Sequence, residues 1–297
     1  MFARAAWTGL NLPADPTAHL PLERKLRVPL SLRYEDISQD GRLALSTAGH
    51  ALSALVWSRA LEHHRAREEF LREGIVPILS RLVVRGEEGR IGIRTPVEAE
   101  GGFEVVRSTE SKVRYRIDMV AKVFSAQENG ERKPLLSILA EHVLTRPFAP
   151  PSQRALDRLP GSLSLDGERP ELPPQGLLEE GEVEWLEAMA QEPVPIVFGI
   201  GHTDANQHVN SLAYLRLFED AILRHLAALG LHTRRFLVLA ELRYRKPCFA
   251  GEALFLWLRS YKRMLSLGYR IGTVAVLVEQ GEQIERGRVF GRFEFEE

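Results

Sequence analysis

The same order of elements occurs in both halves of the chain, and this repetition limits the fold more than any other feature of the sequence. Each half opens with a short alternating strand, followed by a polar loop, a helical run and three or four longer strands. The helical runs cover residues 51–71 and 208–229. Because short links join the strands, the sequence predicts antiparallel meanders and an α+β fold in each half.

The second helical run carries apolar side chains on most of its faces, and Gly230 follows it as a stop signal. Its apolar residues are Val209, Leu212, Leu215, Phe218, Ile222, Leu226 and Leu229. A helix that is apolar nearly all round is buried. The sequence therefore predicts a long central helix wrapped by a curved antiparallel sheet, the arrangement called a hot dog, twice in tandem. Two such halves would pack sheet to sheet as a pseudo-dimer.

A proline-rich stretch separates the two halves. Residues 147–195 hold nine of the 17 prolines, which interrupt helices and sheets and so predict a linker. Within it, residues 176–191 have the composition of a short helix. The predicted parts are an N-terminal extension (1–24), a first hot-dog domain (25–146), the linker (147–193) and a second hot-dog domain (194–297).

The bulk composition excludes several classes of protein. An apolar content of 44% with 27% charged residues is typical of a soluble globular chain, and a net charge of -1 gives no field that attracts nucleic acid. The single cysteine, Cys248, permits neither an internal disulfide nor a cysteine zinc site. The start lacks the apolar core of a signal peptide, and no apolar stretch reaches the ~18 residues of a membrane helix. We therefore expect a cytoplasmic protein without membrane contact.

Four polar side chains alternate in the loop before the second helix: Asp204, Asn206, His208 and Asn210. One interpretation is helix capping, since Asp and Asn satisfy the unpaired amides at a helix start. A cap needs only one such side chain, however, and this spacing can turn three of them toward one pocket beside the partly positive helix start. There Asp204 would activate water or attack directly, while His208 shuttles a proton. Asn206 would hold the carboxylate or the water, and backbone amides would stabilise an oxyanion. From the residues alone both interpretations remain open.

The loop and the start of the helix, DANQHVNSLAY (204–214), resemble the Asp-x-Asn-x-His-Val-Asn-x-x-x-Tyr segment of hot-dog thioesterases. The likeness is greatest to the acyl-ACP thioesterases, which are tandem hot dogs. A second block, LRYRKPCFAGE (242–252), resembles the Tyr-Arg-Arg strand of that family, which is followed by Glu-Cys. Cys248 is retained, but Pro247 stands where the family has a catalytic Glu.

The resemblance implies roles for residues of both blocks. The implied catalytic residues are Asp204, Asn206 and His208, and the implied substrate-binding residues are Asn210, Arg245 and Cys248. Since Pro247 cannot accept a proton, Asp204 would act as the single carboxylate, as in simpler hot-dog thioesterases. The implied reaction is hydrolysis of a fatty acyl thioester on coenzyme A or acyl carrier protein, without a metal or bound cofactor. The acyl chain would lie between the two halves of a monomeric pseudo-dimer or of a homodimer.

Two other functions stay open. A hot-dog dehydratase or hydratase acting on 3-hydroxyacyl thioesters would need a histidine and an acid paired across the site. A non-catalytic acyl-thioester binding protein would account for the missing Glu at Pro247.

The first half has EDISQDGR in the equivalent loop, with Ser38 in place of Asn206 and Asp40 in place of His208. The amide and the imidazole are both missing. We therefore expect a degenerate first site that shapes the acyl pocket. A second activity that uses Asp36 or Asp40 as a single acid stays open as the alternative.

Several further residues in the second half have alternative interpretations. Glu219 lies 11 residues after His208, about 16 Å along a helix axis, and we interpret it as a supporting acid. Tyr214 is expected to pack rather than react, and Glu252 either tops a strand or faces the site. A set of basic residues would bind phosphates or an acidic carrier, or else form a solvated strand face: Arg234, Arg235, Arg243, Arg245, Lys246, Arg259, Lys262 and Arg263.

Overall fold

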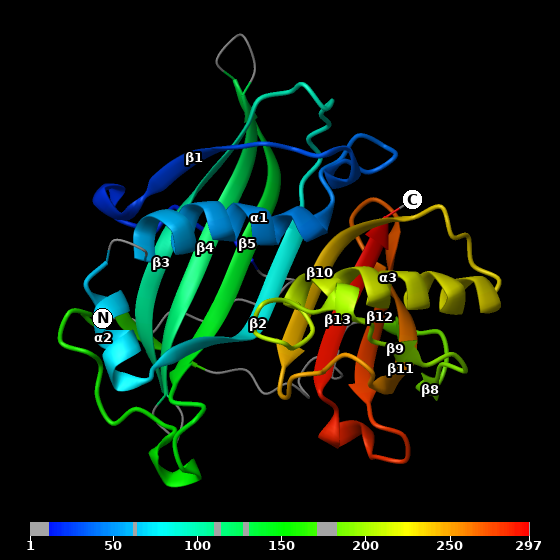
Figure 1. The fold of residues 1–297 in the computed structure, drawn as a ribbon. Helices are drawn as coiled ribbons and strands as arrows, with labels where there is room; N and C mark the ends of the chain where they lie inside the picture. Colours follow the sequence, from blue (N-terminus) through cyan, green and yellow to red (C-terminus); the bar gives the residue numbers. More distant parts are fainter. Residues whose placement is uncertain (1–11, 62–63, 110–113, 127–130, 171–182, 297) are drawn as a thin grey trace. The chain divides into compact units, whose positions relative to one another are not determined.

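The computed structural model describes residues 12–61, 64–109, 114–126, 131–170 and 183–296. The chain divides into two compact units, Met1–Leu172 and Pro173–Glu297. Each unit combines an antiparallel sheet with a helix that lies across one face of it (Figure 1). The fold is therefore α+β and has the tandem hot-dog arrangement that the sequence predicts.

The sheet of the first unit has the strand order β1-β3-β4-β5-β2, and all of these pairs are antiparallel. A short strand, β6 (Gly167–Arg169), adds to β3 in parallel. The strands are β1 (Leu26–Leu30), β2 (Val76–Gly86), β3 (Val97–Ser108), β4 (Tyr115–Ala126) and β5 (Arg132–Thr145). Short 3-10 turns lie at Leu22–Arg24, Tyr34–Asp36, Leu45–Thr47 and Pro151–Gln153.

The single helix predicted over 51–71 is wrong, because the chain forms two helices there. Helix α1 (Ala48–Leu52) continues as a π-helix, Ser53–Leu61, and α2 (Ala66–Glu73) follows as a separate element (Figure 1). The break has a local cause. The ring Nδ1 of His64 accepts a hydrogen bond from the amide of Ala66, one of the unpaired amides at the start of α2, whose N-cap is Arg65.

The sheet of the second unit has the order β10-β13-β12-β11-β7, and β8 and β9 also pair with β11. Its long strands are β10 (Phe236–Tyr244), β11 (Ala253–Met264), β12 (Tyr269–Val278) and β13 (Val289–Glu296). Its short strands are β7 (Glu184–Trp185), β8 (Ala190–Gln191) and β9 (Ile196–Val197), and 3-10 turns lie at Ile200–His202 and Ile284–Arg286.

The helix suggested within 176–191 is also wrong for the part that the structure describes. Residues 184–185 and 190–191 are the strands β7 and β8, which pair with β11. The free edge of β11 offers unpaired backbone groups, and the two short strands satisfy them. Residues 171–182 lie outside the described residues. The predicted linker thus contributes β6 to the first unit and β7 and β8 to the second.

Helix α3 (Ser211–Ala228) is the central helix of the second unit, as predicted, although it begins three residues later than the predicted 208. Its side chains Tyr214, Leu215, Phe218, Ile222 and Leu226 are buried. An aromatic row joins it to the sheet: the ring of Phe218 lies 5.6 Å from that of Phe293, and the ring of Tyr214 lies 5.7 Å from that of Tyr244. No helix among the described residues combines the length and the apolar character that crossing a membrane requires.

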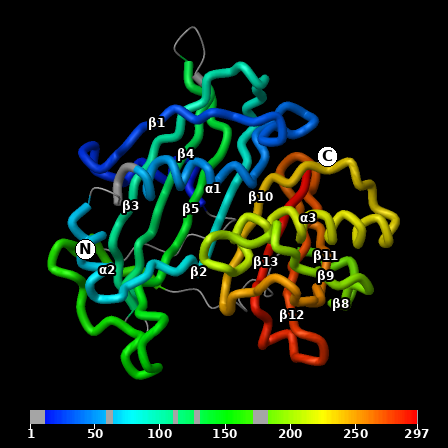
Figure 2. The backbone as a smooth tube through the Cα atoms, in the orientation of Figure 1, coloured from blue at the N-terminus to red at the C-terminus, as the bar shows by residue number. Residues whose placement is uncertain are grey.

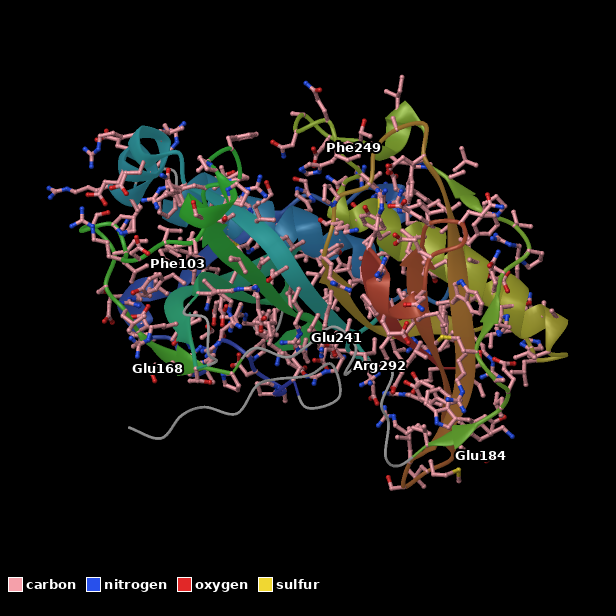
Figure 3. The ribbon with its side chains drawn as sticks, turned by 90° about the horizontal axis from the view of Figure 1, so that it is seen from below. Phe103, Glu168, Glu184, Glu241, Phe249 and Arg292 are labelled. Atoms are coloured by element: carbon pink, nitrogen blue, oxygen red, sulfur yellow. The ribbon has the colours of Figure 1, made fainter. Side chains whose placement is uncertain are left out.

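The face of each sheet that turns away from the helix carries charged side chains, and these are buried. In the second unit Phe293 faces α3, so its neighbours Arg292 and Glu294 face the other way. Glu241 and Arg292 are cross-strand partners, and Figure 3 shows them side by side. Glu241 also accepts hydrogen bonds from Arg243, and all of these residues are less than 5% exposed.

The first unit has a similar buried ionic network on the same side of its sheet. Arg116 pairs with Asp118, and Arg169 from β6 donates to the same carboxylate at 2.9 Å. Arg169 also pairs with Glu104, which His19 contacts at 2.9 Å. Part of the predicted N-terminal extension thus packs on this sheet.

We expect Asp118→Asn to lower the free energy of unfolding by about 3 kcal/mol, because it removes the buried carboxylate charge that Arg116 and Arg169 share. Urea unfolding followed by circular dichroism measures the change. The exposed Asp157→Asn in the same unit is the matched control, and we expect a change within about 0.5 kcal/mol. Equal changes in the two variants would show that the network contributes nothing to stability.

Candidate functional site

The segment 199–210 forms a closed loop that leads from β9 into α3, and the backbone trace in Figure 2 follows this path. A bridge between Thr203 and Val209 closes it, and the amide of Asp204 donates to the carbonyl of His208 at 3.2 Å. Gln207 sits at its tip with a φ of 64°, in the left-handed region. This backbone conformation places residues 204 and 208 next to each other.

The loop brings the three predicted catalytic residues together. Asp204 Oδ1 accepts a hydrogen bond from the amide of Asn206 at 2.8 Å and lies 4.0 Å from His208 Nδ1. The side chains of Asp204 and His208 are 29% and 42% exposed, and Asn206 is exposed. The Asp204 carboxylate and the His208 imidazole are therefore accessible from solvent at one place, whereas Asn206 contacts Asp204 through its backbone amide.

The alternative interpretation is helix capping, and the residue that caps α3 is Asn210, not Asp204 or Asn206. Asn210 Oδ1 accepts a hydrogen bond from the amide of Leu212 at 2.9 Å, which is the geometry of an N-cap. Its Nδ2 donates to Asp204 Oδ2 at 3.5 Å. The side chain predicted to bind substrate thus links the helix start to the Asp204 carboxylate.

Most backbone amides near the start of α3 already donate to acceptors within the protein. This reduces the number of amides that could form the predicted oxyanion site. The amides of Val209, Leu212 and Ala213 donate to Cys248, Asn210 and Asn210 respectively. Between 209 and 213, only the amide of Ser211 has no acceptor among the residues that the structure describes. It is the one backbone donor left in this stretch for a developing oxyanion.

Cys248 connects the two motifs through its backbone. Its carbonyl accepts a hydrogen bond from the amide of Val209 at 2.7 Å. Its thiol is fully buried, next to the hydroxyl of Tyr214, and burial raises the pKa of Cys248 above its ordinary value. The structure thus gives Cys248 a backbone role and keeps its side chain away from the surface.

The predicted basic set does not form one free patch. Arg243 is buried and paired with Glu241, and Arg263 pairs with Glu294. Arg245 is exposed, and its guanidinium donates to the carbonyl of Glu285 at 2.5 Å. Neither a single solvated strand face nor a single phosphate cluster describes these residues.

The equivalent loop of the first unit is closed in the same way but lacks the amide and imidazole side chains of the second. A bridge between Ile37 and Leu43 closes it. Asp36 accepts hydrogen bonds from the amide and the guanidinium of Arg33. Burial alone would raise the pKa of Asp36, but these hydrogen bonds and the Arg33 charge hold it below its ordinary value. Burial would likewise raise the pKa of Asp40, but hydrogen bonds from the Ser38 hydroxyl and the Arg42 amide hold it below its ordinary value.

Glu252, for which the sequence left two interpretations open, contacts Arg288, a residue that the sequence analysis did not identify. Glu252 accepts a hydrogen bond from the amide of Phe249 and from Arg288, and Arg288 also donates to the carbonyl of Pro247. Arg288 lies 40 residues beyond Cys248 in the chain and has no motif around it, so no local signal could identify it.

We expect Asn210→Ala to lower the free energy of unfolding by about 1 kcal/mol, because α3 loses its N-cap. Asn210→Ser retains an oxygen acceptor at this position and should recover most of the loss. Urea unfolding of both variants measures the difference. If Ala and Ser are equally destabilised, the side chain of Asn210 does not act as a cap.

A second prediction concerns Glu219, on α3. Burial, with a smaller contribution from the charge of Asp220, raises the pKa of Glu219 from 4.5 to about 7. A raised pKa in the folded state contributes stability that is complete below the unfolded pKa and is lost as the pH rises through the folded value. Glu219→Gln should therefore flatten the fall in unfolding free energy between about pH 4.5 and about pH 7. Asp220→Asn should keep most of that fall, and identical curves for wild type and Glu219→Gln would contradict the prediction.

Comparison with known proteins supports the fold. No protein-family model matches the sequence, and no curated protein matches it. Among the solved structures that resemble it are three with 14% identity each. A Lactobacillus plantarum protein provisionally described as an oleoyl thioesterase has a TM-score of 0.59, and the match covers 91% of this chain and 95% of that one. An acyl-ACP thioesterase from Bacteroides thetaiotaomicron has a TM-score of 0.57, with 92% of this chain and 98% of that one covered. The 12:0-ACP thioesterase from Umbellularia californica has a TM-score of 0.56, with 92% of this chain and 94% of that one covered. The resemblance extends over nearly the whole chain, which has the double hot-dog fold.

Proposed function

We propose that the chain hydrolyses acyl thioesters to a free acid and a thiol. The observation that carries the proposal is the position of the Asp204 carboxylate, which lies 4.0 Å from the His208 imidazole on a closed, solvent-accessible loop at the start of α3. Such a pair supplies a general base and a proton carrier at one place.

In the proposed reaction Asp204 takes a proton from a water molecule, and the water oxygen bonds to the thioester carbonyl carbon. The amide of Ser211 and the side chain of Asn206 donate hydrogen bonds to the oxyanion that develops. The carbon–sulfur bond then breaks, and the departing sulfur receives the proton held by Asp204, directly or through His208. Water and thioester are consumed, and one acid and one thiol are formed.

The proposed carrier of the acyl group is acyl carrier protein or coenzyme A. Two of the similar structures are named for acyl-ACP substrates, which supports the first of these carriers. The sulfur arm arrives with the substrate in either case, so the reaction as written uses only water and the side-chain and backbone groups of this chain.

A substrate panel tests the proposal. Acyl-CoA and acyl-ACP thioesters of several chain lengths are incubated with the wild type, and free thiol is measured with a thiol reagent. We expect Asp204→Asn to lower kcat/KM by about 10²- to 10⁴-fold and His208→Gln by a similar factor. The exposed Asp220→Asn is the matched control on α3, with an expected change of less than about twofold.

The same assay separates the alternative functions. Adding 3-hydroxyacyl and enoyl thioesters and following enoyl absorbance identifies a dehydratase or hydratase. If thiol release is equal in wild type and Asp204→Asn, Asp204 is not the base. If no thioester in the panel reacts but acyl thioesters bind, the chain is a binding protein.

A further inference from the structure

Arg288, immediately before β13, makes a dense set of side-chain contacts close to the candidate site. Its Nε and Nη2 donate to Glu279 Oε1 at 2.9 and 2.5 Å. Its Nη1 donates to the carbonyl of Pro247 at 3.0 Å and to Glu252 Oε2 at 2.8 Å. The side chain is only 13% exposed, and its guanidinium also lies beside the Cys248 thiol. One planar group therefore joins three segments of the second unit.

These contacts close the turn 247–252 around Arg288. The Glu252 carboxylate accepts from Arg288 and also from the amide of Phe249 at 2.8 Å. Gly251 has a φ of 90°, which side chains with a Cβ rarely adopt. Phe249 lies on this turn and its side chain is exposed (Figure 3). The turn is thus fixed from within by one carboxylate and one guanidinium.

The candidate loop is attached to this turn at both of its ends. At the far end, the amide of Val209 donates to the carbonyl of Cys248 at 2.7 Å. At the near end, the amide of Phe198 donates to the carbonyl of Glu252 at 2.9 Å, and the amide of Gly251 donates to the carbonyl of Phe198 at 2.7 Å. A displacement of the turn therefore moves both ends of the segment that carries Asp204.

We infer that Arg288 is a positioning residue for the Asp204–His208 loop. This inference rests on the proposed function. Arg288 fixes the turn 247–252, the turn fixes the loop, and Glu279 orients the guanidinium from its other side. Arginine suits this role because its rigid planar fork donates in several fixed directions at once, whereas the single ammonium of lysine does not.

The inference gives a physical role to the departure at Pro247. The position holds no carboxylate, but the proline ring fixes φ and the carbonyl oxygen is an acceptor for Arg288. Within the turn 247–252 the carboxylate is that of Glu252, and it accepts hydrogen bonds from the Arg288 guanidinium and the Phe249 amide. Position 247 thus serves the geometry of the turn.

The test combines kinetics with amide exchange on the full chain. We expect Arg288→Ala to lower kcat by about 10²-fold, since an ångström-scale misplacement of catalytic groups has effects of this size, while KM changes less than about threefold. Hydrogen exchange of the Val209 amide should accelerate, whereas amides in the middle of β12 and β13 stay protected. Free guanidinium should restore part of the kcat of Arg288→Ala.

Matched variants complete the design. Arg286→Ala removes an exposed arginine two positions away and should leave kcat and Val209 exchange unchanged. Glu279→Gln removes the carboxylate charge that orients the Arg288 guanidinium. The Glu279 side chain is 40% exposed. The Glu279→Gln variant is expected to lower kcat by about 3- to 10-fold, and it keeps the test valid if Arg288→Ala does not fold.

Two outcomes overturn the inference: unchanged kcat in Arg288→Ala, or reduced kcat with unchanged Val209 exchange. If Arg288→Ala loses amide protection throughout the second unit, Glu279→Gln decides, and unchanged kcat or unchanged Val209 exchange in that variant overturns the inference. The amide exchange needs no substrate, so its result stands even if no thioester is hydrolysed. If Asp204→Asn is inactive while Arg288→Ala keeps full kcat, the positioning role fails and the proposed hydrolase activity survives.

Discussion

The hydrogen bond from the amide of Val209 to the carbonyl of Cys248 is the contact on which the candidate site depends. It joins a loop that precedes a helix to a turn that follows a strand, and the two lie about 40 residues apart in the chain. Backbone hydrogen bonds at both ends hold the loop, so its polar side chains can remain accessible without being held by core packing. A reactive carboxylate needs this combination, because it must meet substrate and still keep its position to within about half an ångström.

The two units show that the loop geometry and the loop chemistry are separable. Bridges between Ile37 and Leu43 and between Thr203 and Val209 close the corresponding loops in the same way. In the first loop the Asp36 carboxylate is bound by Arg33, whereas in the second the Asp204 carboxylate faces an accessible imidazole. The same closed loop therefore carries a carboxylate bound by arginine in one unit and an accessible carboxylate beside an imidazole in the other, which agrees with the general rule that function resides in sites and not in folds.

The parts of the fold that the sequence predicts are those set by local periodicity. The burial of Phe218 and Ile222 follows from a 3.6-residue repeat. The break at His64 and the strands β7 and β8 were not predicted, because each depends on a particular hydrogen bond or on a free strand edge far away in the chain. Likewise, the polar spacing of 204–208 is visible in the sequence, but the contacts of Arg288 with Pro247 and Glu252 arise only when β13 returns beside β10.

The buried state of Cys248 bears on which atom attacks the substrate in the proposed reaction. A thiolate route would require an accessible sulfur whose pKa is lowered by a positive neighbour. Here the thiol is fully buried and its pKa is raised by that burial, even though Arg288 lies next to it. The guanidinium is already engaged by Glu279 and Glu252, so its charge is largely compensated. With the thiol withdrawn and no carboxylate at position 247, Asp204 is the acid with both access and a proton-carrying neighbour, and attack by a water molecule that it activates is the route that this arrangement favours.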